Sequence, residues 1–180
     1  QDRTVEIANE YKKIFNKLGI KYRILSEEDD GIYDAFNKGV KQVTGDFITF
    51  LNSDDWYEKD ALSTMEKAYM DNPYDIAYGT IRYICKGKKS VIKKSKIDKF
   101  VSSRNWNHPS CIVKRELYLN DPFESKYRVY ADFHWYLKMR KAFINITILP
   151  PNIVITNFTA GGASINCDIK ASLQRANEKY

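Results

Sequence analysis

The residues best suited to chemistry are the polar side chains of "NSDD", residues 52–55, which directly follow the apolar run "FITFL". Two adjacent carboxylates repel each other unless a cation, a proton or a helix N-terminus shares their charge. Carboxylate and amide oxygens are the ligands that Mg²⁺ and Mn²⁺ prefer in proteins. The same side chains can instead cap a helix that begins near residue 58. From spacing alone, a metal-anchored site and a helix cap are equally good interpretations.

Helices and strands alternate in the first half of the chain. Apolar residues recur at helical spacing over 4–19, 32–43 and 58–72, and strands are expected at 20–25, 46–52 and 75–84. This alternation is typical of a parallel α/β sheet, in which ligands bind beyond the carboxyl ends of the strands. The run 46–52 is apolar at almost every position, which predicts a strand buried on both faces. The polar residues 52–55 therefore lie at the expected ligand-binding edge.

The second half is less regular. Strands are expected at 91–97, 109–115, 144–149 and 152–156, a helix at 129–142, and a helical tail from Asp168. The sequence contains no repeat and no linker, which predicts one domain over 1–180. Its first half, 1–84, has a nucleotide-binding pattern, and its second half, 85–180, is more variable.

Composition limits the classes of protein to consider. With 180 residues, 43% of them hydrophobic, the chain is long enough to bury a core, and no apolar run approaches the ~20 residues of a membrane helix. Three widely spaced cysteines, Cys85, Cys111 and Cys167, predict free thiols in a reducing compartment. We therefore expect a cytoplasmic protein.

Charge is unevenly distributed: residues 1–60 carry a net charge of −4 and residues 61–180 a net charge of +10. The densest cationic segment is "KGKKSVIKKSKIDK", residues 86–99, which holds seven lysines and one aspartate. It is either a solvated hairpin or a surface that meets an anionic partner, such as lipid headgroups at the inner face of a membrane. Nucleic acid is not expected, because the segment has no arginine and no aromatic residue for stacking.

The stretch "SEEDDGIYDAFNKGVKQVTGDFITFLNSDDWYEKDAL" (26–62) closely resembles the family 2 glycosyltransferases, particularly bacterial enzymes of surface polysaccharide synthesis. Two further segments are similar to the same family: "NHPSCIVKRELY" (107–118) with "FESKYRVYADFHWYLKMRK" (123–141), and "FTAGGAS" (158–164). The resemblance implies the glycosyltransferase-A fold, a Rossmann-like, mostly parallel sheet flanked by helices, with a smaller mixed region on the acceptor side. Residues 1–84 would bind the nucleotide sugar, and residues 85–180 the acceptor.

The resemblance also implies an activity and its ligands. The expected reaction is an inverting transfer of a sugar from a nucleotide-sugar donor, UDP-linked in our prediction, to a saccharide or lipid-linked acceptor, with Mn²⁺ or Mg²⁺ as cofactor. Asp54 would hold the metal on the donor diphosphate. Asn52, which stands where many members have Asp, would face the ribose or bind the metal more weakly. The other residues implied to lie near the donor are Asp30, Asn37, Lys38 and Asp55.

On the acceptor side, Asp132 matches the catalytic base of the family, and His108 matches a histidine near the acceptor. A base is needed because a sugar hydroxyl is a poor nucleophile. The alternatives are that Asp132 is a surface acid of its helix and His108 a packing residue. His134, Trp135, Tyr33, Trp56 and Tyr57 are interpreted as packing residues.

The sequence departs from the family pattern at its start. "QDRTVEI" resembles the end of a family motif that follows two strands, so we expect an N-terminally truncated domain whose open sheet edge is covered by other chain segments or by a homodimer. Two other functions compete with sugar transfer. One is a metal-dependent sugar nucleotidyltransferase, and the other is a non-catalytic module that binds anionic surfaces.

Overall fold

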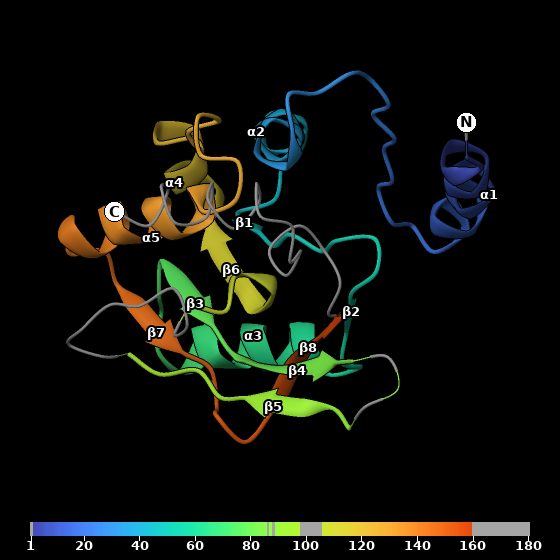
Figure 1. Cartoon of the computed structure of the whole chain (residues 1–180). Coiled ribbons are helices and arrows are strands. Elements are labelled where there is room, and N and C mark those ends of the chain that lie inside the picture. Colours follow the sequence, from blue (N-terminus) through green and yellow to red (C-terminus); the bar gives the residue numbers. More distant parts are fainter. Residues whose placement is uncertain (1, 86, 88, 98–105, 160–180) are drawn as a thin grey trace. The chain divides into compact units, whose positions relative to one another are not determined.

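The computed structural model describes residues 2–85, 87, 89–97 and 106–159, and it divides into two units, 1–30 and 31–180 (Figure 1). In the first unit, Thr4–Lys17 forms helix α1, as its apolar spacing predicts. The strand expected at 20–25 is wrong, because no strand pairs with these residues and their backbone is irregular. A strand needs a hydrogen-bonded neighbour, and local sequence cannot supply one.

The second unit holds all the strands of the described residues. Its elements, in chain order, are α2 (Ile32–Gln42), β1 (Phe47–Ile48), β2 (Trp56–Tyr57), α3 (Ala61–Asp71), β3 (Ile76–Tyr78), β4 (Thr80–Ile84), β5 (Val91–Lys93), a short 3₁₀ helix η1 (His108–Ser110), β6 (Cys111–Lys114), α4 (Arg115–Asn120), α5 (Ala131–Lys141), β7 (Ile146–Ile148) and β8 (Val154–Thr159). The expected helices at 32–43 and 129–142 are confirmed. Sequence patterns did not predict β2 or α4. The helical tail expected from Asp168 lies outside the described residues.

The strands form two mixed sheets, with the orders β1-β6-β3-β7 and β2-β8-β4-β5. The α/β class is confirmed, but the pairing differs in detail from a mostly parallel sheet. Only β3–β7 and β4–β8 pair in parallel among the described strands, and the other four pairings are antiparallel. A parallel strand was expected over 46–52, but only β1 forms there, and it pairs antiparallel with β6. After Ile48 the chain leaves the sheet and leads to the turn at residues 52–55.

Gly79 divides the single strand expected over 75–84 into two strands of different sheets, β3 and β4. A Cβ at this position would lie 2.4 Å from Cγ1 of Ile155 and 3.3 Å from Cδ1 of Leu149. The two sheets therefore meet at a point where only glycine leaves enough room.

The core lies on both faces of β3. Ile76 and Tyr78 pack with side chains of α2 and α5, whereas Ala77, between them, packs with Ala61 and Met65 of α3. This is the two-residue alternation of a strand that is covered on both sides. Figure 1 shows α5 and α3 on opposite sides of the β3 strand.

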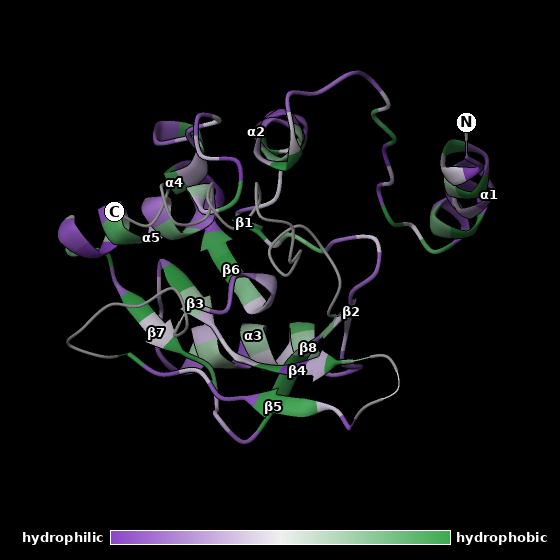
Figure 2. Cartoon of the chain, viewed as in Figure 1, coloured by the Kyte–Doolittle hydropathy of each residue, from purple (hydrophilic) through white to green (hydrophobic). Residues whose placement is uncertain are grey.

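Strand β5 forms one edge of the second sheet, and Figure 2 shows it in the hydrophobic colour. Val91 and Ile92 of this strand are exposed. Lys89, Lys94 and Lys96, from the described part of the lysine-rich segment, are also exposed. Each helix in the described part of the chain is too short or too polar to cross a lipid bilayer.

Candidate active site

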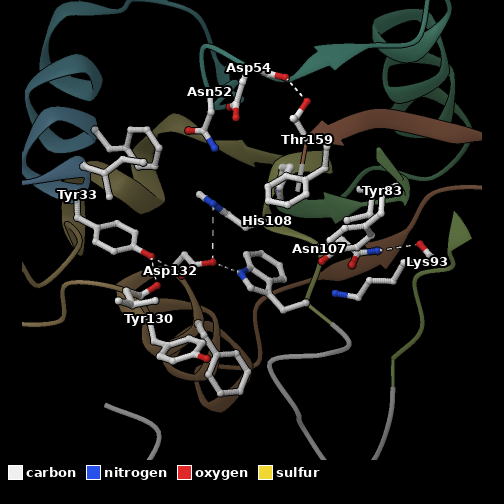
Figure 3. A pocket seen from close by; sticks show the side chains of 18 of the residues that line it. Tyr33, Asn52, Asp54, Tyr83, Lys93, Asn107, His108, Tyr130, Asp132 and Thr159 are labelled. Carbon is white, nitrogen blue, oxygen red and sulfur yellow. Dashed lines mark hydrogen bonds and ion pairs between the residues drawn. The ribbon is translucent and has the colours of Figure 1, made fainter. Parts of the chain in front are cut away.

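A cavity of about 450 Å³ opens where the two sheets, α2 and the start of α5 meet (Figure 3). It brings together side chains that are far apart in the sequence. The predicted site residues that line it are Asn52, Asp54, His108 and Asp132. The other lining residues used below are Tyr33, Ile81, Tyr83, Lys93, Trp106, Asn107, Arg128, Phe158 and Thr159.

The turn at residues 52–55 forms one wall. It is closed by the backbone N–H of Asp55, which donates to the carbonyl of Asn52 at 3.1 Å. Thr159, at the end of β8, holds the turn from outside: its N–H donates to Oδ1 of Asp55 at 2.9 Å, and its hydroxyl donates to the carbonyl of Asp54 at 2.5 Å. These bonds leave the exposed carboxylate of Asp54 at the cavity.

The helix-cap alternative is wrong for both aspartates. Helix α3 begins at Ala61, and its N-cap residue is Asp60, which makes no capping hydrogen bond with its side chain. Asp55 instead serves the turn, because its buried carboxylate accepts from Thr159 and, at 3.4 Å, from Nδ2 of Asn52. Burial raises the pKa of Asp55. Asp55 is not a lining residue of this cavity, so it supports Asp54 and Asn52 from behind.

Asp132 lies in the first turn of α5, on the wall opposite Asp54 (Figure 3). The hydroxyl of Tyr33 lies 2.7 Å from its Oδ1, and the indole N–H of Trp106 donates to its Oδ2 at 3.1 Å. The hydroxyl of Tyr33 also lies 2.7 Å from the carbonyl of Val129, just before the helix. A carboxylate held through both oxygens has a fixed orientation, so Asp132 is not an ordinary surface acid of its helix.

His108 stands between the two aspartates in Figure 3. Its Nδ1 lies 3.8 Å from Oδ2 of Asp132, and its ring is surrounded by those of Phe36, Phe50 and Phe123. Burial lowers the pKa of His108, and the charge of Asp132 opposes that shift. Within the described structure, Nε2 of His108 is buried without a hydrogen-bond partner. The imidazole therefore favours its neutral form.

Like Asp55, the predicted donor residues Asn37 and Lys38 do not line the cavity. The amide of Asn37 donates to the carbonyl of Phe123 at 2.8 Å and accepts from its N–H at 3.0 Å, so it ties α2 to the segment before α5. Lys38 pairs with Asp34 at 3.0 Å, one turn earlier on the same helix. Asp30 belongs to the first unit, 1–30. Their roles toward a nucleotide stay predictions.

Sequence reasoning missed several cavity residues, chiefly Lys93, Asn107 and Arg128, and it assigned Tyr33 to packing only. Tyr33 belongs to the "GIYDA" run and Asn107 to the "NHPS" run, so the motifs contained signals for both. Nothing in the sequence distinguishes Lys93 from the other lysines of segment 86–99. Arg128 lies within the second similar segment, and nothing in its spacing marks it as a cavity residue.

The oxygen ligands that line the cavity can take part in binding a divalent cation but are too few to enclose one. Asp54 contributes a carboxylate and Asn52 an amide oxygen, and no group of three or more acidic, histidine or cysteine ligands exists in the described ranges. Mg²⁺ and similar ions are commonly bound by one or two carboxylates together with substrate phosphates. The residues present fit that arrangement.

The fold and the cavity define a class: an α/β protein with one acidic residue on each side of a cavity at the sheet edge. Comparison with known proteins gives the family. The model of glycosyl transferase family 2 matches residues 1–144, and the chain belongs to that family.

Similar proteins with assigned names are also glycosyltransferases. The PGL/p-HBAD biosynthesis glycosyltransferases of Mycobacterium bovis and Mycobacterium tuberculosis are 30% identical to this chain over 149 residues, which cover 76% of this chain and 53% of theirs. Glycosyltransferase GlyA of Streptococcus pneumoniae is 31% identical over 78 residues, 43% of this chain and 11% of that protein. The chain thus spans about half the length of the mycobacterial relatives that it matches.

Solved structures show the same fold. Residues 1–349 of S. aureus TarS, in complex with UDP-GlcNAc, superpose with a TM-score of 0.67 at 21% identity, covering 90% of this chain and 47% of that 1–349 chain. A second crystal structure, TarS 1–349 in complex with UDP, gives a TM-score of 0.63 at 20% identity, covering 99% of this chain and 53% of that chain. The predicted family and fold class are confirmed.

Proposed function

We propose that this chain transfers a sugar from a UDP-linked donor to a saccharide or lipid-linked acceptor, with inversion at the anomeric carbon. The observation that carries this proposal is that Asp54 and Asp132 line the same cavity from opposite sides (Figure 3). A direct displacement needs this arrangement, because the leaving diphosphate departs from one face of the sugar while the acceptor hydroxyl attacks the other.

On the donor side, Asp54 and Asn52 would hold Mn²⁺ or Mg²⁺ together with the diphosphate. The cation supplies charge neutralisation for the departing nucleoside diphosphate. Thr159 and Asp55 keep the turn in place, so that Asp54 needs no rearrangement to meet a ligand. The UDP and UDP-GlcNAc complexes of TarS, a protein of the same fold, support a uridine nucleotide as donor.

On the acceptor side, Asp132 would accept the proton of the attacking hydroxyl. Tyr33 and Trp106 hold its two oxygens, so that the base is oriented before the acceptor arrives. General-base catalysis of this kind contributes about 10²–10⁴-fold to a rate. His108, neutral and packed beside the carboxylate, would shape the acceptor side of the cavity.

The test is calorimetric titration of UDP into the protein, with and without Mn²⁺, for the wild type, Asp54→Ala and Asp60→Ala. Asp54 is exposed, so its loss should not disturb folding. Asp60, at the start of α3, is also exposed, makes no capping hydrogen bond with its side chain and does not line the cavity, so it serves as the control. We expect Mn²⁺-dependent binding that weakens more than ~tenfold in Asp54→Ala, the loss of about one charge-assisted contact, and stays unchanged in Asp60→Ala. Equal binding by Asp54→Ala and wild type would contradict the donor site.

Two further partners are proposed from the sequence pattern. The exposed lysines Lys89, Lys94 and Lys96 would make a peripheral contact with anionic lipids at the cytoplasmic face of a membrane. A homodimer would cover an open sheet edge.

A further inference from the structure

Lys93 differs from its neighbouring lysines in the direction of its side chain. It is the last residue of β5 and pairs with Ile81 of β4, and both residues line the cavity. Lys89, Lys94 and Lys96 are exposed, whereas Lys93 is half-buried. The amide of Asn107 donates to the backbone carbonyl of Lys93 at 3.3 Å, which fixes the end of β5 beside the cavity.

The ammonium of Lys93 has no ion-pair partner within 4.0 Å among the residues that the structure describes. Asp132 is the acid that affects it electrostatically, and both oxygens of Asp132 are already bound by Tyr33 and Trp106. Burial lowers the pKa of Lys93, which is the mark of a cation that has lost part of its water. Partial burial of a charge is costly unless an opposite charge or hydrogen bonds compensate it.

The position of Lys93 separates it from the donor residues. In Figure 3, Asn52 and Asp54 lie on one side of His108, and Lys93 and Asp132 lie toward the other. The wall near Lys93 also contains Tyr83 and Phe158, whose ring centroids lie 5.1 Å apart. Aromatic rings beside a cation suit a ligand that has a sugar ring and an anionic group.

We propose that Lys93 binds an anionic group of the acceptor, so that the acceptor is a phosphorylated saccharide or a saccharide attached through phosphate. This inference rests on the proposed function, because it divides the cavity into a donor side and an acceptor side. The phosphate oxygens would accept hydrogen bonds from Nζ of Lys93, and the acceptor hydroxyl would face Asp132. The same chemistry exists in the diphosphate of the donor, so the experiment must separate the two sources.

The experiment compares glucose 6-phosphate with glucose, two probes that differ by one phosphate, in calorimetric titrations of the wild type, Lys93→Met and Lys94→Met. Methionine keeps the length and apolar stem of lysine but removes the charge, and Lys94 is the exposed neighbour that controls for the loss of net charge. We expect the wild type to bind glucose 6-phosphate at least ~tenfold more tightly than glucose, the effect of about one charge-assisted contact. Lys93→Met should lose this preference, and Lys94→Met should keep it.

Thermal melting of each variant verifies its folding, and UDP titrations with Mn²⁺ on the same proteins identify the source of the phosphate. Unchanged UDP binding by Lys93→Met, with the loss of glucose 6-phosphate binding, supports an acceptor phosphate. Loss of both ligands overturns the proposal, because Lys93 then belongs to the donor site. Equal effects of the two lysine variants, or no preference in the wild type, also overturn it. If UDP fails to bind any variant, the donor proposal fails, while Lys93-dependent binding of glucose 6-phosphate still supports the anion site.

Discussion

Gly79→Ala tests how the two sheets meet beside the cavity. The new methyl group would lie 2.4 Å from Cγ1 of Ile155 and 3.3 Å from Cδ1 of Leu149. Both neighbours are completely buried, so neither can move into solvent. Carbon atoms normally pack at about 3.5–4.0 Å, and the substitution therefore forces the sheets apart or displaces Ile155.

The expected cost follows from these contacts. Overpacking a well-packed core costs about 1–3 kcal/mol, and the 2.4 Å approach indicates the upper part of that range. The carbonyl of Gly79 also accepts hydrogen bonds from Asn107 at 3.0 Å and Ser110 at 2.7 Å, and each weakened bond adds up to about 1 kcal/mol. We expect the free energy of unfolding to fall by about 3 kcal/mol, a large part of the typical ~5–15 kcal/mol.

Urea unfolding measures this loss, and Gly39→Ala is the matched control. A Cβ at Gly39, inside α2, would meet no atom within 4 Å, so that substitution should stabilise the helix by about 0.5–1 kcal/mol. Ile155→Ala should cost about 2–5 kcal/mol alone, and the double variant with Gly79→Ala should cost at least ~1 kcal/mol less than the sum. Additive effects, or a Gly79→Ala variant as stable as the wild type, would refute the proposed close contact.

Two further predictions concern the cavity. Tyr33→Phe should lower the free energy of unfolding by about 1–2 kcal/mol, because the hydroxyl contacts both Asp132 and Val129. Tyr83→Phe, in the same cavity, is the control, and equal losses in urea unfolding would argue against a special role for Tyr33. The second prediction is that stability falls as the pH is lowered through about 6.5, since burial lowers the pKa of His108 and the unfolded chain then binds a proton that the folded protein resists. Urea midpoints at about pH 8 and about pH 5.5 should differ less for His108→Phe than for the wild type; parallel pH dependences would contradict this assignment.

Local patterns predicted most of the helices, because an amphipathic helix repeats its apolar residues at helical spacing in its own sequence. The runs that became α1 and α2 show this directly. The strands were harder, since pairing depends on distant partners. Residues 46–52 look like a long buried strand, yet only Phe47 and Ile48 pair, because the chain then turns away toward residues 52–55.

The candidate site was predicted through motifs rather than through spacing. Asp54, Asn52, His108 and Asp132 were chosen from similar segments, and the structure places all four at one cavity. Spacing alone could not exclude a helix cap, because the start of α3 depends on where β2 pairs with β8.

The inward position of Lys93 was also beyond sequence reasoning. Which lysine of a cationic segment faces the protein depends on the register of β5 against β4. The pairing of Lys93 with Ile81 sets that register, and a shift by one residue would turn the neighbouring side chain toward the cavity instead.

The hydrogen bonds from Thr159 to Asp54 and Asp55 have a consequence for the order of folding. They join residues that are 105 and 104 positions apart, so they are contacts of high sequence separation. Such contacts form late, because a long loop must close before they can contribute. During synthesis, the turn that carries Asp54 would therefore stay loosely held until β8 has left the ribosome, so this wall of the cavity would be completed only after β8 has been made.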